Sequence, residues 1–357
     1  MLKKTSLYNQ HLTAKLVDFG GWEMPLHYGS QIEEHHQVRR DAGIFDVSHM
    51  TIIDLTGTKV KEFLRYLLAN DVDKLTTIGK ALYSCMLNEN GGVIDDLIVY
   101  YQSDVQFRIV VNSLTRAKDI AWIKLHAKKF AVQLKERDDL AMIAVQGLQV
   151  MEKVDNLLPK KVLALKPFHA TWWDNRFIAR TGYTGENGFE IMLPAEEAPD
   201  LWESFLSNGI QPIGLGARNT LRLEAGMNLY GIDMDENCSP LEAGLNWTVA
   251  WNPPDRDFIG RQALQVQKDT GNHQIMIGLV LLDKGMLRDH QTISTKNGEG
   301  YITSGSFSPT LGKSIAFARL PMGKYEQVTV QIRNKTLLAK VVKPPFVKNG
   351  KVCINLN

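Results

Sequence analysis

The chain has 357 residues, which is too long for one ordinary domain, so we expect two or three domains with separate cores. Its formal net charge of +2 is too close to balance to predict nucleic acid or an anionic membrane as a partner. Hydrophobic residues make up 44% and charged residues 22%, as in soluble globular proteins, and no run of 18 apolar residues predicts a membrane-spanning helix.

The cysteines and the N-terminal residues bear on the compartment. Cys85, Cys238 and Cys353 are odd in number and lack CxxC spacing, which is typical of free thiols in a reducing environment. Residues 1–12 contain neither the apolar core of a signal peptide nor an Arg/Ser-rich presequence. We therefore expect a cytoplasmic protein.

Residues 1–50 are expected to form turns and short helices, with a polar helix at 32–40 and a buried extended segment at 42–50. Three histidines, His35, His36 and His49, raise the question of a metal site. No cysteine or carboxylate lies at ligand spacing from them, and adjacent His35 and His36 point to different faces. The sequence therefore predicts no metal.

Residues 51–138 show a strand and helix pattern that favours a ferredoxin-like split βαβ unit. Apolar residues after residue 57 recur at the 3.6-residue spacing of an amphipathic helix. The expected elements are a strand at 51–55, a helix at 60–68, strands at 83–87, 93–101 and 107–112, a helix through 120–130 and a strand at 131–134.

The hairpin at 83–101 carries two adjacent aspartates, Asp95 and Asp96. Asn and Gly at 88–92 supply the positive-φ residues that a tight turn needs. Side chains alternate along the second strand, and both faces are otherwise apolar, so at least one carboxylate is poorly solvated. Such a group must be paired, hydrogen-bonded or protonated, and either a ligand or a structural salt bridge satisfies this need. Spacing alone does not say which aspartate matters.

Asn112 ends the neighbouring strand. It is placed either to reach the pocket of the aspartates or to serve as a helix N-terminal cap or turn residue.

Residues 139–228 add further strands at 140–147, 177–180 and 189–193. The glycine-rich turn at 181–188 lacks the Lys-Ser/Thr of a P-loop, and GLG at 214–216 lacks the rest of a dinucleotide fingerprint. Glu190 lies on the strand face opposite Phe189, where it either faces solvent or recognises a ligand. Arg218 falls in the first turn of a helix, where it either pairs with Glu224 or another acid, or binds a ligand.

Residues 229–272 are rich in Pro and Asp and are interpreted as a connecting segment. Short strands separated by turns follow, which is typical of a β-barrel or jelly-roll domain. The expected strands are 275–282, 300–303, 314–319, 328–333 and 337–343.

Four long motifs then place the chain in a known family. They are ALYS-x-MLN-x-x-GGVIDDLIVY, RTGYTGE-x-GFE, GLGAR-x-x-LRLEAGM and TSG-x-FSPTLG, which begin at residues 81, 180, 214 and 303. Together they closely resemble the aminomethyltransferases, the T-proteins of the glycine cleavage system. The resemblance extends from about residue 5 to 350, and the motifs fall in family order.

The resemblance implies an α+β fold, a three-domain cloverleaf with tetrahydrofolate in the hole where the domains meet. The implied parts are a discontinuous folate-binding domain at 1–50 and 139–245, a ferredoxin-like insert at 51–138 carrying the hairpin, a connecting segment at 246–272 and a C-terminal β-barrel or jelly-roll domain at 273–357.

The resemblance also implies the reaction and its residues. The methylene of the aminomethyl group on the dihydrolipoyl arm of H-protein passes to tetrahydrofolate, giving 5,10-methylenetetrahydrofolate and ammonia. Asp96 is the implied catalytic acid. The predicted partners are lipoylated H-protein and folate, with no metal, nucleic acid or membrane. The predicted folate-binding residues are Glu190, Arg218, Asn112, Tyr83, Tyr100, Tyr183, Met50 and Lys348.

Two other functions are open at this point. One is a related folate-dependent demethylase acting on a small methylated compound. The other is a non-catalytic folate-binding factor for tRNA modification or iron–sulfur maturation, whose KGCY-x-GQE motif is absent here.

Lys348 departs from the arginine common in relatives and loses the planar fork of a guanidinium.

Overall fold

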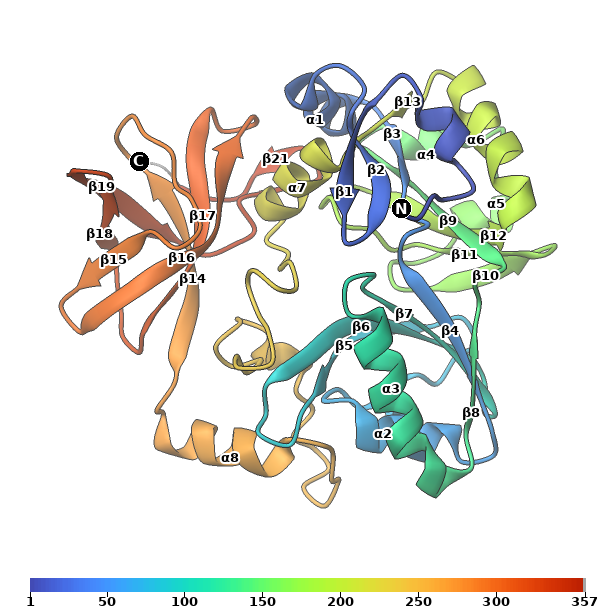
Figure 1. Ribbon diagram of the computed structural model, residues 1–357, viewed down its shortest axis with the longest axis horizontal. Coiled ribbons are helices and arrows are strands. Elements are labelled where there is room, and N and C mark those ends of the chain that lie inside the picture. The colour runs from blue at the N-terminus through green and yellow to red at the C-terminus, as the bar shows by residue number, and fades with distance from the viewer. Residues whose placement is uncertain (356–357) are drawn as a thin grey trace.

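The structure, a computed structural model, describes residues 1–355. The chain forms a six-stranded sheet with helices, a five-stranded sheet with helices and a closed six-stranded barrel, and these three units surround the middle of the molecule (Figure 1). This arrangement confirms the predicted α+β class and decides for a barrel at the C-terminus. The exact domain limits stay a prediction.

The six-stranded sheet joins distant parts of the chain. Strand β3 pairs with β9, with Ile44 opposite Val145, and all neighbours are antiparallel except β13, which runs parallel to β3. The strands, in sheet order, are β10 (Ala170–Trp173), β11 (Arg176–Ala179), β12 (Gly188–Pro194), β9 (Leu140–Gln146), β3 (Gly43–Asp46) and β13 (Gln211–Pro212). The accompanying helices are α1 (Gln31–Arg40), α4 (Val150–Lys153), α5 (Lys160–Leu163), α6 (Ala198–Ser207) and α7 (Leu215–Glu224).

Alternation along β12 decides where Glu190 lies. Phe189 and Ile191 belong to the buried cluster that packs under α6 around Trp202. Met192 belongs to a second cluster, which includes residues of α1 and α7 on the other face of the sheet. Glu190 shares the face of Met192, as the two-residue period requires. The sheet therefore points this carboxylate away from the α6 core.

The five-stranded sheet has the strand order of a ferredoxin-like unit with one strand added. The order is β5-β6-β7-β4-β8, in which β6, β7, β4 and β8 form the split βαβ pattern and β5 extends its edge. Apolar residues of α2 and α3 pack against one face of this sheet. The elements are β4 (Thr51–Thr56), α2 (Val60–Leu67), β5 (Ala81–Leu87), β6 (Val93–Ser103), β7 (Gln106–Val111), α3 (Arg116–Ala127) and β8 (Gln133–Glu136).

The C-terminal barrel closes through β14 and β19. Its strands are β14 (Gln274–Leu281), β15 (Thr292–Thr295), β16 (Gly298–Ser308), β17 (Lys313–Pro321), β18 (Gln327–Ile332) and β19 (Lys335–Val342), followed by a small hairpin of β20 (Val347–Lys348) and β21 (Lys351–Val352). The sequence does not predict β15, because Ile293 is its only buried side chain and a single apolar residue gives no period.

Other elements also differ from expectation. The N-terminal region contains a hairpin of β1 (Lys15–Phe19) and β2 (Trp22–His27), and the connecting segment contains helix α8 (Arg261–Thr270). Leu264 is the only buried residue of α8, so the helix lacks the apolar stripe that would predict it. Short 3-10 helices occupy Tyr8–His11, Val72–Lys74, Lys128–Phe130, Ala195–Glu197 and Asn246–Thr248.

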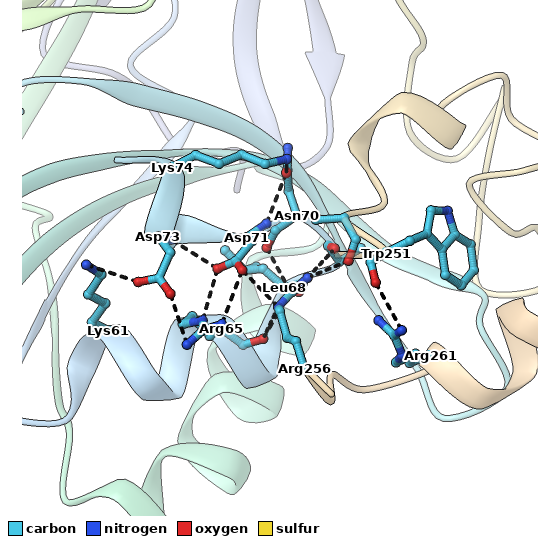
Figure 2. A network of polar contacts seen from close by, with 12 residues as sticks. Lys61, Arg65, Leu68, Asn70, Asp71, Asp73, Lys74, Trp251, Arg256 and Arg261 are labelled. Atoms are coloured by element: carbon cyan, nitrogen blue, oxygen red, sulfur yellow. Dashed lines mark hydrogen bonds and ion pairs between the residues drawn. The ribbon is translucent and has the colours of Figure 1, made fainter. Parts of the chain in front are cut away.

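The connecting segment is fastened to the insert by one buried arginine. The Arg256 guanidinium donates hydrogen bonds to five backbone carbonyls (Figure 2), those of Arg65, Leu68, Ala69, Asn70 and Ala250. Four of these carbonyls lie at or just beyond the end of α2, where a helix leaves carbonyls unpaired and favours a positive charge. Burial lowers the pKa of Arg256 to about 10, so the side chain stays charged at neutral pH.

We predict that Arg256→Ala lowers the free energy of unfolding by about 3 kcal/mol or more, because it leaves several buried backbone carbonyls without a hydrogen bond at once. Arg256→Lys keeps the charge but loses the forked guanidinium, so its free energy of unfolding should lie between those of wild type and Arg256→Ala. Urea denaturation measures the effect, with Arg40→Ala, an exposed arginine, as the control. A urea midpoint of Arg256→Ala equal to that of wild type would contradict the stabilising role of Arg256.

Candidate functional site

A cavity of about 850 Å³ lies where the three units meet. Most of its wall is apolar, with a small number of polar side chains, as in sites that bind small organic ligands. The insert contributes Tyr83, Asp96, Tyr100 and Asn112; the six-stranded unit contributes His49, Met50, Tyr183, Glu190 and Arg218; the barrel and the chain that follows it contribute Met276, Phe317, Lys343, Pro344 and Pro345.

Asp96 is the aspartate that faces the cavity. It lies on β6 opposite Cys85 of β5, and two side chains hold its carboxyl group. Tyr83 Oη donates to Oδ2 at 2.8 Å, and Asn112 Nδ2 donates to Oδ1 at 3.0 Å. Burial and the charge of Asp95 raise the pKa of Asp96 to about 7, so the group can hold or release a proton near neutrality.

Asp95 points to the opposite side and is fully buried. Its Oδ2 accepts the backbone N–H of Asn112 and its Oδ1 accepts Asn112 Nδ2, both at 2.9 Å. Asn112 therefore does reach the aspartates, and its amide bridges the two carboxyl groups. This geometry separates the roles of two residues that the sequence pattern leaves equivalent.

Aromatic rings form much of the cavity wall. The Tyr83 ring stacks on Trp247 with centroids 5.5 Å apart, and the Tyr100 ring packs edge-on against Phe177 at 5.4 Å. Burial raises the pKa of Tyr183 to about 12, so its hydroxyl stays protonated and donates to the carbonyl of Asn228. Flat aromatic walls suit a planar ligand.

Glu190 and Arg218 bring opposite charges to the cavity. Glu190 accepts a hydrogen bond from Thr181 Oγ1, and burial raises the pKa of Glu190. The Arg218 guanidinium lies 4.4 Å from the centroid of the Tyr183 ring and, among residues 1–355, has no hydrogen bond or ion pair. A guanidinium with five free donors on a cavity wall suits an acceptor-rich ligand.

The salt bridge between Arg218 and Glu224 that the sequence leaves open is wrong. Glu224 lies 3.0 Å from Arg39 and 3.2 Å from His35, and it also accepts hydrogen bonds from Ser308 and Thr310. With its oxygens fully engaged elsewhere, Glu224 leaves Arg218 free for the cavity.

The predicted contact of Lys348 finds no support in the geometry. Lys348 is exposed on β20 and is not part of the cavity wall, because pairing of β20 with β21 turns Val347 inward and Lys348 outward. Lys343 lines the cavity instead. The other predicted site residues, Tyr83, Tyr100, Tyr183 and Met50 among them, all lie on the wall.

Sequence reasoning missed Trp247 and the position of His49. Trp247 is 61% exposed yet stacks on Tyr83, and the one signal that could have identified it is a tryptophan within a connecting segment rich in Pro and Asp. His49 is buried on the wall, where burial and the charge of Arg218 lower its pKa to about 4. Within residues 1–355, no three His, Cys, Asp or Glu side chains gather as a metal site would require.

Comparisons with known proteins cover almost the whole chain. The family profile described as GCVT N-terminal domain matches residues 7–253, and the one described as Glycine cleavage T-protein C-terminal barrel domain matches residues 275–348. A relative named aminomethyltransferase, from Nitrosococcus oceani, is 56% identical over 360 residues, covering 99% of this chain and 97% of that protein.

A solved structure agrees. The crystal structure of glycine cleavage system aminomethyltransferase T from Bartonella henselae superposes with a TM-score of 0.92 and 34% sequence identity, covering 98% of this chain and 99% of that one. With both family profiles matched and both relatives aligned from end to end, the chain belongs to the glycine cleavage T-protein family.

Proposed function

We propose that the chain is the aminomethyltransferase of glycine cleavage, with tetrahydrofolate as acceptor and the dihydrolipoyl arm of H-protein as donor. The methylene carbon forms bonds to N5 and N10 of the folate and loses its bonds to sulfur and nitrogen. The nitrogen leaves as ammonia and the sulfur stays on the arm as a thiol. The observation that carries the proposal is a carboxyl group, Asp96, held by two hydrogen bonds on the wall of a cavity built by three units.

Asp96 is the proposed catalytic residue. Positive charge develops on the methylene carbon as its first bond breaks, and a fixed carboxylate nearby stabilises that charge. With a pKa of about 7, the same group can also take part in moving a proton from the folate nitrogens to the departing groups. Holding the two bulky carriers in one cavity supplies much of the remaining rate.

Glu190 is the proposed pterin ligand. A carboxylate offers two acceptor oxygens to the parallel N–H donors of an aminopyrimidine ring. The unpaired Arg218 guanidinium suits a polar edge or a carboxylate of the folate, and Lys343 adds a second cation on the wall. We propose Tyr83, Tyr100, Tyr183, Met50 and Asn112 as further wall contacts.

The proposal also covers the compartment and the two alternative functions. None of the helices in residues 1–355 is long and apolar enough to cross a membrane. Cys85, Cys238 and Cys353 are free thiols, which supports the cytoplasm as the proposed compartment. No observation in the described chain specifically favours a demethylase or a non-catalytic folate-binding factor, so neither is proposed.

We predict that Asp96→Asn cuts turnover by a factor on the order of 10² to 10³, because the amide cannot stabilise the positive charge or carry the proton. Folate affinity should change little, because the side chain keeps its size. The measurement is ammonia release from aminomethylated H-protein with tetrahydrofolate, alongside calorimetric titration of folate. Asp104→Asn, the same change at an acid outside the cavity, is the control. Turnover near the wild-type value would defeat the assignment.

We predict that Glu190→Gln weakens folate binding by roughly tenfold to a hundredfold, the usual cost of losing a hydrogen bond to a charged group. The change replaces one acceptor oxygen by a donor that faces the N–H donors of the pterin. Titration calorimetry gives the Kd, and Glu203→Gln, at an exposed position on α6, is the matched control. An unchanged Kd would remove Glu190 from the binding site.

We predict that turnover falls as the pH drops below about 7, because the proposed role of Asp96 requires a carboxylate. The raised pKa has a second consequence. Between about pH 4 and 7 the folded chain keeps a proton that the unfolded chain loses, so the contribution of Asp96 to stability declines as pH rises through this range. The pH profile of kcat tests the predicted fall in turnover. A wild-type kcat that stays constant from pH 6 to 8, or an acid limb that is unchanged in Asp96→Asn, would contradict that prediction.

A further inference from the structure

Behind the cavity wall lies a buried carboxyl group that the proposed reaction does not use. Asp119, in the first turn of α3, is 0% exposed. Neither of its carboxyl oxygens receives a hydrogen bond from a donor among residues 1–355. Because an isolated buried carboxylate is costly, this group must either be protonated or have a purpose that offsets the cost.

Asp119 faces Asp95, the fully buried neighbour of Asp96. Helix α3 packs against β6, and the two buried carboxyl groups are close enough for each to shift the pKa of the other. The Thr115 hydroxyl is also nearby, but it donates its single proton to the carbonyl oxygen of Asn112 at 3.0 Å. A hydrogen bond between the two acids therefore requires a proton that one of them carries. Two like charges at contact in a dry interior are not both retained.

The hydrogen bonds decide which acid holds the proton. Asp95 already accepts the backbone N–H and the side-chain amide of Asn112, one on each oxygen, both at 2.9 Å. Such bonds favour the charged form, and Asp119 receives none. Burial and the charge of Asp95 raise the pKa of Asp119 to about 10. Asp119 is therefore the protonated partner at neutral pH.

The pair is connected to Asp96 through one side chain. Asn112 Nδ2 donates to Asp95 Oδ1 at 2.9 Å, to Asp96 Oδ1 at 3.0 Å and to the Asp96 carbonyl oxygen at 3.3 Å. The rotation of this amide is thus set on one side by Asp95 and fixes Asp96 on the other.

We propose that Asp119 is a positioning residue: it keeps a proton and donates it to Asp95, so that Asp95 orients Asn112 and thereby Asp96. The positioning step rests on the proposed function of Asp96, whereas the protonation of Asp119 does not.

Other titratable groups lie around the pair, but they do not supply the proton that joins Asp119 to Asp95. Asp96 and its cross-strand partner Cys85 lie on the other face of the sheet, and Lys118 on α3 and Tyr230 in the connecting chain also lie close enough to interact electrostatically with the pair. Lys118 Nζ donates to Tyr230 Oη and to Glu236, at 2.7 and 2.6 Å, and not to either acid of the pair.

Two substitutions separate positioning from bulk packing. Asp119→Asn is isosteric and offers an amide proton to Asp95, so turnover should stay within about twofold of wild type with an unchanged pH profile. Asp119→Leu keeps a buried side chain of similar size but removes the donor, so kcat should fall about tenfold with little change in the KM for folate. Asp138→Asn, at an exposed acid of the same unit, is the control.

The pH profile of Asp119→Leu gives a readout that packing alone would not move. Without its donor, Asp95 takes up a proton more readily and repels charge on Asp96 less. The acid limb of kcat should therefore shift to lower pH in Asp119→Leu and return to the wild-type position in Asp119→Asn. The positioning role would be overturned if Asp119→Leu kept both the wild-type kcat and the wild-type position of the acid limb. It would also be overturned if the acid limb of Asp119→Asn were displaced.

Infrared spectroscopy tests the proton directly and needs no activity. At a pH of about 8.5, above the pKa of Asp96 and below that of Asp119, wild type should show the C=O stretch of a buried protonated carboxyl. The band should be missing from Asp119→Asn and retained in Asp96→Asn. Its absence from wild type, or its persistence in Asp119→Asn, would overturn the proposal even if Asp119→Leu failed to fold. A band behaving as expected in a chain that releases no ammonia would instead count against the proposed function alone.

Discussion

One amide group holds two neighbouring carboxyl groups at the cavity wall, and the proposed chemistry depends on that contact. Asn112 Nδ2 lies 2.9 Å from Asp95 and 3.0 Å from Asp96. Burying charge costs several kcal/mol unless hydrogen bonds offset it, and the two hydrogen bonds to each carboxyl group offset only part of that cost, since burial still raises the pKa of both acids. The uncompensated part is seen in Asp96, whose pKa of about 7 lets it exchange a proton under the conditions in which it works.

The contact can act only if the three units keep their places around the cavity. Glu224 on α7 joins the six-stranded unit to the barrel, since Arg39 and His35 meet Thr310 at its carboxylate. Burial by itself would raise the pKa of Glu224, but these partners lower it to about 2, so the joint stays charged. Arg256 fastens the connecting segment to α2 in the same way, with backbone carbonyls in place of a carboxylate (Figure 2). Both joints act at a distance from the reacting atoms, where they fix the geometry that transfer between two carriers requires.

Local periodicity predicted those parts of the fold and site whose signal lies within one strand. Alternation along β6 and β12 placed a carboxylate in poor solvent and put Glu190 on the face away from the α6 core. The same alternation could not choose Asp96 over Asp95, because both faces of β6 are covered and only the resemblance to a family distinguished them. Local periodicity could not predict contacts between distant parts of the chain: Glu224 binds partners on α1 of its own unit and in the barrel, and Lys348 points outward because of a strand that follows it. Elements with a single buried side chain, β15 and α8, gave no period to detect.

A structure of the chain bound to tetrahydrofolate tests the central claim most directly. We expect the pterin in the cavity, its aminopyrimidine N–H groups on Glu190, and the Asp96 carboxyl within hydrogen-bonding distance, direct or through one water, of the reacting folate nitrogens. A folate bound outside the cavity, or an Asp96 carboxyl turned away from N5 and N10, would contradict the account.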